Sequence, residues 1–163
     1  MTKTILLTNG KGEALVDDED FQYLSQFKWC MQDKYYAKRY VSSRTVNGKQ
    51  SCKYMQMHRE IMNAPDGVQI DHINHNKLDN RKENLRFATA GQNSSNRAKR
   101  KTKSSSPFKG VSWCNRLKRW KAGIKVKNKS IHLGYHFCPV EAAKAYNDAA
   151  LKYKEGYDWL NPI

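Results

Sequence analysis

The first part of the chain alternates short apolar runs with polar turns. Runs of apolar, aromatic or β-branched residues predict strands at 5–7, 14–16, 28–31, 35–42 and 53–57. Asn9-Gly10 and Asn47-Gly48 are dipeptides typical of tight hairpin turns, and they separate two pairs of these strands. One short helix is expected over 17–26, beginning at Asp17 or Asp18. This pattern predicts a small β-sheet that serves as a lid or platform.

The next segment, 58–96, is polar and rich in His and Asn. Alternation around 68–70 predicts a strand that ends at Asp71-His72, with an antiparallel partner at 85–88 after a loop. Thr89-x-x-Gln92 fits a capping box, so a helix should begin there and carry Asn93 near its first turn. The expected order is strand, loop, strand and helix, which would bring Asp71, His72 and Asn93 together.

The last part has the clearest pattern. Alternating residues predict three strands, at 110–114, 119–126 and 130–135. A helix should follow from Pro139 to about Glu155, with Gly156 ending it, and its recurring alanines would let it lie close to the sheet. We therefore expect an α+β protein. Its expected parts are an N-terminal β segment (1–57), a core (58–96), a linker (97–107) and a sheet with one helix (108–163).

Charged residues are unevenly distributed along the chain, and this indicates a kind of binding partner. The 163 residues carry 30 Lys and Arg against 15 Asp and Glu, a net charge of +15. From 97 to 140 there are 13 basic residues and no acidic one. Such a stretch suits the dense negative charge of nucleic acid, whereas a surface that only keeps a protein soluble usually mixes both signs.

Hydropathy and cysteine usage argue against a membrane-spanning protein and against a zinc-stabilised one. The mean hydropathy is −0.89, and every apolar run falls far short of the ~20 residues that a membrane-spanning helix needs. No apolar stretch follows Met1, so we expect a cytoplasmic protein without a membrane partner. None of the four cysteines (Cys30, Cys52, Cys114 and Cys138) belongs to a C-x-x-C pair, so we expect reduced thiols and no structural zinc.

The polar segment carries the candidate chemistry. Mg²⁺ prefers oxygen ligands and keeps several waters, so the Asp71 carboxylate and the Asn93 amide oxygen would suffice beside the phosphate oxygens of a substrate. A neutral His72 could take a proton from an attacking water, since histidine titrates near pH ~6.5. The metal would stabilise the charge that develops when a phosphodiester is cleaved.

These residues resemble the HNH nuclease motif, in the variant with Asn as its last member. The likeness extends from Met57-His58-Arg59 to Asn93, and the spacing resembles that of the phage and intron-encoded homing endonucleases of the ββα-metal fold. The resemblance implies that His72 is the general base, that Asp71 and Asn93 bind one divalent metal, and that Asn84 braces the loop. Mg²⁺ is the expected metal, with Mn²⁺ as an alternative. His75 is the rival for the base, and Asn80 is the rival for the bracing residue.

The last part resembles the APETALA2 DNA-binding domain. The likeness rests on the strings Phe108-Lys109-Gly110-Val111-Ser112-Trp113, Arg119-Trp120-Lys121-Ala122-Gly123-Ile124 and His132-Leu133-Gly134-Tyr135, and on Glu141 to Tyr146 with Leu160-Asn161. In that family a three-stranded sheet lies in the DNA major groove. Together with the charge, the resemblance predicts DNA contacts from Arg97, Lys99, Arg100, Lys101, Lys103, Lys109, Trp113, Arg116, Lys118, Arg119, Lys125 and Lys127.

The sequence thus predicts a metal-dependent endonuclease that nicks or cuts double-stranded DNA, acting as a monomer or as a DNA-induced dimer. If a phage encodes it, its place is the cytoplasm of the bacterial host. One catalytic set per chain favours nicking. The alternative is a DNA-binding regulator whose HNH core is inactive.

Overall fold

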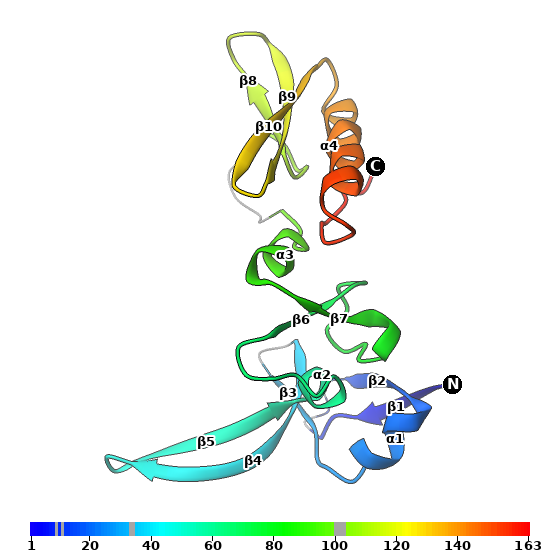
Figure 1. Ribbon diagram of the computed structural model, residues 1–163, viewed down its shortest axis with the longest axis vertical. Coiled ribbons are helices and arrows are strands. Elements are labelled where there is room, and N and C mark those ends of the chain that lie inside the picture. Colours follow the sequence, from blue (N-terminus) through cyan, green and yellow to red (C-terminus); the bar gives the residue numbers. More distant parts are fainter. Residues whose placement is uncertain (9, 11, 33–34, 100–103) are drawn as a thin grey trace. The chain divides into compact units, whose positions relative to one another are not determined.

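The computed structural model describes residues 1–163 except 9, 11, 33–34 and 100–103 (Figure 1). The chain folds into two compact units, Met1–Thr89 and Ala90–Ile163. Strands, short helices and one long helix are mixed along the chain, so the expected α+β class is confirmed. In the described part of the chain, no helix is both long and apolar enough to cross a membrane.

The first unit begins with a two-stranded sheet and a short helix. Strands β1 (Thr2–Leu6) and β2 (Glu13–Asp17) pair antiparallel, and α1 (Asp18–Leu24) follows directly. They enclose a hydrophobic core because alternate strand residues and one face of the helix are apolar. The buried members of this core are Ile5, Leu7, Ala14, Val16, Leu24, Trp29, Ala37 and Met57.

A second sheet of the first unit has the order β3-β4-β5. Its strands are β3 (Cys30–Gln32), β4 (Tyr36–Val46) and β5 (Lys49–Gln56). The β4–β5 hairpin is longer than expected, because both strands run up to the Asn47-Gly48 turn instead of stopping at 42 and starting at 53. A five-residue helix, α2 (Met57–Ile61), follows at once, where the sequence had predicted the end of a strand.

A short hairpin completes the first unit. Strand β6 (Gln69–His72) pairs antiparallel with β7 (Leu85–Ala88), and a loop with the 3-10 turn η1 (Lys82–Asn84) joins them. Strand, loop and strand thus follow in the expected order. The next helix, α3 (Ala90–Ser95), begins directly after Thr89 and belongs to the second unit.

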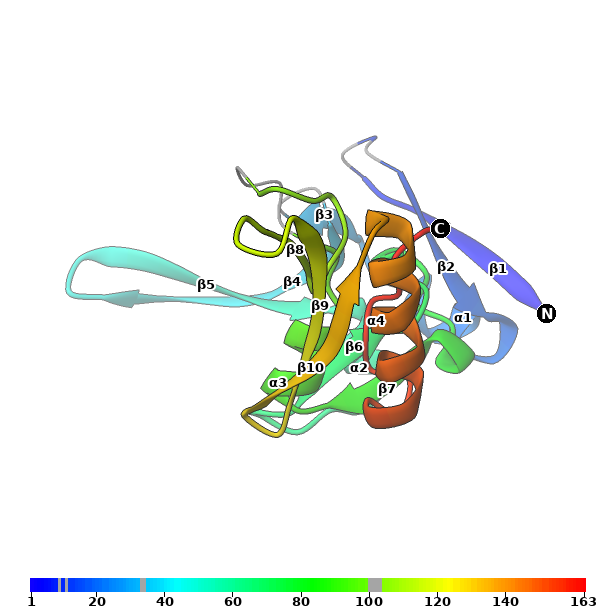
Figure 2. The ribbon, with the colours of Figure 1, turned by 90° about the horizontal axis from the view of Figure 1, so that it is seen from above.

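The rest of the second unit is a three-stranded antiparallel sheet with one helix. The sheet has the order β10-β9-β8, from β8 (Val111–Cys114), β9 (Arg119–Val126) and β10 (Lys129–His136). Helix α4 (Pro139–Tyr153) lies along this sheet (Figure 2). Its buried face is small, with Ala142, Ala143, Tyr146, Ala149 and Ala150 against the strands.

Gly110 shows how close this packing is. Its φ is +73°, and a Cβ atom there would lie 2.0 Å from the Tyr146 ring and 2.6 Å from the Gly123 carbonyl oxygen. Its own carbonyl accepts the Gly123 N–H at 2.9 Å. A side chain at this position would therefore push α4 away from the sheet.

Candidate active site

Strand β6 ends on two buried polar residues. Asp71 is 1% exposed and His72 is not exposed at all, although both stand at the end of a two-stranded sheet. Burying a carboxylate costs free energy unless a cation or hydrogen-bond donors compensate it. The surroundings of these two side chains therefore decide what they can do.

Arg86 compensates Asp71 from the facing strand. The register pairs Asp71 directly with Arg86, whose Nε and Nη2 donate to Asp71 Oδ2 at 3.0 and 2.8 Å. A role for this arginine was not predicted from the sequence, because only the strand register brings it opposite the aspartate. A cation that binds the Asp71 carboxylate would have to compete with the guanidinium or share the carboxylate with it.

The His72 imidazole lies among aromatic rings. Its ring centroid is 5.2 Å from that of His58 and 5.9 Å from that of Tyr36. Burial lowers the pKa of His72 to about 4; nearby Lys77 acts in the same direction, while Asn80 and Asp71 oppose it. The imidazole is therefore neutral at pH 7, which is the form that can accept a proton.

His58, on α2, lies beside His72. It is 6% exposed, and within the described part of the chain its Nδ1 has no hydrogen-bond partner. Burial, with a smaller contribution from His72, lowers its pKa to about 3. Its ring contacts are to His72 and to Tyr36, whose centroid is 5.1 Å away.

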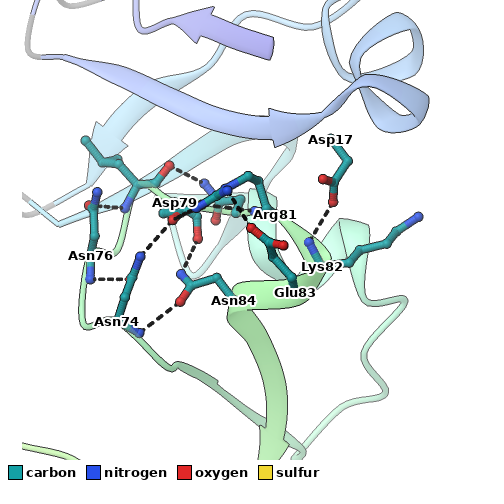
Figure 3. Close-up of polar contacts among 10 residues, drawn as sticks. Asp17, Asn74, Asn76, Asp79, Arg81, Lys82, Glu83 and Asn84 are labelled. Carbon is teal, nitrogen blue, oxygen red and sulfur yellow. Dashed lines mark hydrogen bonds and ion pairs between the residues drawn. The ribbon is translucent and has the colours of Figure 1, made fainter. Parts of the chain in front are cut away.

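Asn84 ties together the two ends of the loop that follows His72 (Figure 3). Its Oδ1 accepts the Asn74 N–H at 2.9 Å, and its Nδ2 donates to the Asp79 carbonyl oxygen at 2.8 Å. Its own carbonyl accepts the Ile73 N–H at 2.9 Å. Asn80 makes no such bridge: its Nδ2 donates to the nearby Leu78 carbonyl at 3.1 Å.

Asp79 is the other fixed point of the loop. Its carboxylate accepts from Arg81 Nε and Nη2 at 2.8 and 2.7 Å, and from Asn74 Nδ2 at 2.7 Å. The hydrogen bonds from Arg81 are the main reason that the pKa of Asp79 is lowered. Asp79 is 1% exposed, so this carboxylate serves as an internal anchor of the loop.

The same loop is joined to strand β2. The Leu15 N–H donates to the Leu78 carbonyl and the Leu15 carbonyl accepts the Asn80 N–H, both at 2.8 Å. Asp17 Oδ2 accepts the Lys82 N–H at 2.7 Å (Figure 3). The N-terminal strands thus support the loop, a specific role that the sequence pattern, which predicted a lid or platform, did not indicate.

Asn93, the expected second metal ligand, lies half-buried on α3 in the second unit. Hydrogen bonds at the end of α3 hold it to that unit. Ser95 supplies its carbonyl to Lys109 Nζ and to the Trp159 N–H, and its Oγ to Lys154 Nζ at 3.1 Å. Within the described part of the chain, no group of three or more His, Cys, Asp or Glu side chains gathers into a metal site.

Two of the lysines expected to contact DNA are used inside the second unit. Lys109 Nζ forms an ion pair with Asp158, which is 8% exposed and also accepts the Tyr146 hydroxyl at 2.8 Å. Lys99 Nζ donates to the carbonyls of Ser106 and Phe108 at 2.8 and 2.9 Å, and burial lowers its pKa. Both ammonium groups therefore have internal partners, and we leave them out of the proposed DNA contacts.

The other expected contacts are mostly on the surface. Arg119 lies over the Phe137 ring, with Cζ 3.2 Å from its centroid. Trp113 is 37% exposed and packs edge-on against the half-buried Trp120, with centroids 5.0 Å apart. Exposed cations are Arg97, Arg116, Lys118, Lys125 and Lys127. Arg100, Lys101 and Lys103 lie outside the described residues.

The face of the sheet opposite α4 carries polar residues that were not among the predicted DNA contacts. Lys121 pairs with Tyr135, and His132 pairs with Gly123, so these side chains share the face of Lys125. Lys121, His132 and Tyr135 are all exposed. Strict alternation along β9, from Lys121 through Gly123 to Lys125, is the sequence signal that could have identified this face.

Part of the chain is similar to HNH endonucleases. Residues 63–95 match the family model described as HNH endonuclease, a span that holds Asp71, His72, Asn84 and Asn93. The chain is 34% identical, over 78% of its length, to an uncharacterized HNH endonuclease of Acanthamoeba polyphaga mimivirus. It spans 63% of that protein's length. No solved structure matches the chain. The family match and this similarity support a nuclease.

Proposed function

We propose that this chain is a metal-dependent DNA endonuclease that hydrolyses phosphodiester bonds, with His72 as the general base. The observation that carries the proposal is the buried, neutral His72 beside Asp71 at the start of a loop that Asn84 holds together. A neutral imidazole can accept the proton of an attacking water, and a fixed loop keeps it in one orientation. Asn84 then acts as a positioning residue.

The donor set fits a hard divalent cation. Asp71 offers carboxylate oxygens and Asn93 an amide oxygen, which suit Mg²⁺ and also Mn²⁺. Both residues fall in the segment that matches the HNH family, and this supports their pairing as ligands. When bound, the metal would stabilise the negative charge that develops during cleavage. Arg86 would then either release the Asp71 carboxylate or share it with the metal.

We further propose that the second unit binds double-stranded DNA through the outer face of its sheet, in the manner of the APETALA2 domain it resembles. Lys121 and Lys125 lie on this face beside His132 and Tyr135, and charge favours it, since 97–163 hold 16 basic and 4 acidic residues. Lysines on this face would contact phosphates, while the sheet itself would lie in the DNA groove and fix the position of the protein along it.

One catalytic set per chain favours nicking, by a monomer or by a dimer that forms on DNA. Cleavage would be directed to specific DNA sites, as in the phage homing endonucleases that the chain resembles. It would follow from base contacts of the second unit added to cleavage at His72.

A specific observation favours a second candidate, a DNA-binding regulator with an idle core. His72 is fully buried, and Asp71 is held by Arg86. For cleavage, the imidazole has to become accessible to a water at a DNA phosphate, and Asp71 has to turn from the guanidinium to a metal. A regulator would need neither change.

Supercoiled plasmid distinguishes the two candidates. The protein should convert it to the nicked form with Mg²⁺ or Mn²⁺ but not with EDTA, and His72→Ala should lose this activity while it still binds DNA. His75→Ala is the matched control and should keep cutting. Cleavage that survives in His72→Ala but not in His75→Ala would transfer the base to His75. Binding without cleavage, with either metal, would establish the regulator.

A further inference from the structure

The β4–β5 hairpin extends away from the body of the first unit (Figures 1 and 2). Residues 40–45 and 47–54 are all exposed, and Ala37 at the root of the hairpin belongs to the buried hydrophobic core. A two-stranded ribbon without a third layer is marginally stable in water, and its free edges invite association with other strands. The outer part of this hairpin, 40–54, is called the arm below. Core packing does not explain its length.

The arm has a single sign of charge. Between Tyr36 and Gln56 the sequence holds five basic residues and no acidic one. Arg39 at the root is used internally, since its Nη2 and Nε donate to the Glu60 carboxylate at 2.6 and 2.8 Å. Three other cations, Arg44, Lys49 and Lys53, belong to the exposed arm.

The strand register gathers these three cations on one face. Lys49 and Lys53 alternate with Ser51 along β5, and Arg44 lies opposite Ser51 on β4. Three positive charges on one side of a ribbon repel one another, so this placement costs free energy in the isolated protein. A polyanion held against that face would remove the cost.

The opposite face carries two tyrosines at its inner end. The rings of Tyr40 and Tyr54 meet edge-on with centroids 6.2 Å apart, and Lys38 Nζ lies 3.8 Å from the centroid of the Tyr54 ring. The two tyrosines are 54% and 45% exposed. They stiffen the inner part of the arm by cross-strand contact, which favours a fixed direction over free movement.

The root of the arm lies at the candidate active site. Strand β4 begins with Tyr36, whose ring is 5.9 Å from that of His72. A nucleic acid whose phosphate reaches His72 therefore comes to the point from which the arm extends.

We propose that the arm is a second DNA-contacting element, separate from the basic second unit, that binds duplex DNA along the major groove with Arg44, Lys49 and Lys53 on phosphates. The inference rests on the proposed function for its substrate. Two paired strands lie about 4.8 Å apart, and the major groove of DNA is about 12 Å wide and admits such a ribbon. The narrow major groove of an RNA duplex does not admit it.

The test compares two pairs of exposed lysines in the same unit. Lys49→Gln with Lys53→Gln removes two charges from the arm, and Lys3→Gln with Lys28→Gln removes two elsewhere. Affinity for a DNA duplex of mixed sequence is measured against salt concentration, in EDTA so that no cleavage occurs. Each lost phosphate contact lowers the slope of log affinity against log salt by about 0.9, so the arm pair should lower it by about 1.8. Adding Arg44→Gln should lower it further, and the control pair should leave it unchanged.

The outcomes separate this proposal from the one on which it rests. If the wild-type chain binds no DNA duplex, both proposals fail. If it binds and the arm pair keeps the wild-type slope, only the arm is overturned. An equal loss in the control pair would also overturn it, because the effect would then be one of total charge. If the arm variant aggregates while its slope is unchanged, the lysines only protect free strand edges.

Discussion

Two hairpins of the first unit use the same secondary structure in opposite ways. The β6–β7 hairpin has four-residue strands, the Asp71 and His72 side chains at the end of β6 are buried, and its loop is held by the buried Asn84 and Asp79. The β4–β5 hairpin has strands of eleven and eight residues, and its outer polar side chains face solvent. The polar groups of the β6–β7 hairpin bond to one another and hold its loop in place, whereas those of the β4–β5 hairpin remain available to a ligand.

This contrast separates two kinds of polar residue. In the short hairpin, a polar side chain with its partner removed leaves another buried group unsatisfied. On the arm, the same removal exposes only groups that water already solvates. Substitutions in the short hairpin should therefore change stability, and those on the arm should change ligand binding.

The largest effect is expected from Asp79→Ala. It removes a 1%-exposed carboxylate that holds Arg81 and Asn74, and we expect a loss of about 3 kcal/mol in the free energy of unfolding. Urea denaturation measures it. Glu83→Ala is the control, because Glu83 also pairs with Arg81 but its side chain is 69% exposed, so less than about 1 kcal/mol should be lost. Equal losses would show that Asp79 is no anchor.

Asn84→Ala should come next, at about 2 kcal/mol, since it leaves the Asn74 N–H and the Asp79 carbonyl without their partner. Plasmid nicking should fall as well while DNA affinity stays, because the loop loses its brace but the arm and the second unit are unchanged. Asn76→Ala, on the exposed side of the loop, is the matched control. A variant with wild-type stability and nicking would remove Asn84 from its proposed role.

Acid should destabilise the first unit. Burial holds the pKa of His58 at about 3, below the ordinary 6.5, so the unfolded chain binds the extra proton first. The contribution is complete above pH 6.5 and is lost as the pH falls toward 3, by up to about 1.4 kcal/mol per pH unit. Urea unfolding across this range measures the slope, and His58→Phe should reduce it. An unchanged slope in the variant would mean that His58 is not the titrating group.

The smallest effect is expected on the arm. Ser43→Ala and Gln50→Ala, each a loss of polar groups at an exposed position, should change the free energy of unfolding by less than about 0.5 kcal/mol. The same urea experiment applies. A loss as large as that of Asn84→Ala would mean that the arm packs on the body, and the contrast between the hairpins would fail.

Strong periodicity explains what the sequence could predict. The three strands and long helix of the second unit fall within a few residues of their expected bounds, since alternation, Pro139 and Gly156 all agree. The β6–β7 pair was likewise expected. Helix α2 was missed because five residues are too few for a helical period, and it forms through burial of Met57.

The unforeseen parts of the site depend on partners distant in the sequence. The role of Arg86 follows from the strand register, and the internal use of Lys109 follows from Asp158, far along the chain. A run of cations does not reveal which of its members will be buried. The arm was underestimated because its Ser, Lys and Gln residues have little preference for strands; the Asn47-Gly48 turn and the ladder form it.

The bond between the Lys82 N–H and Asp17 joins residues 65 positions apart. Closing so long a loop costs chain entropy, and its contacts cannot form before both ends have been synthesised. On the ribosome, β2 is synthesised before the arm, α2 and β6. The loop after His72, which is bonded to β2, should therefore become ordered late. A nascent chain should consequently lack the ordered loop after His72 until the first unit has been synthesised.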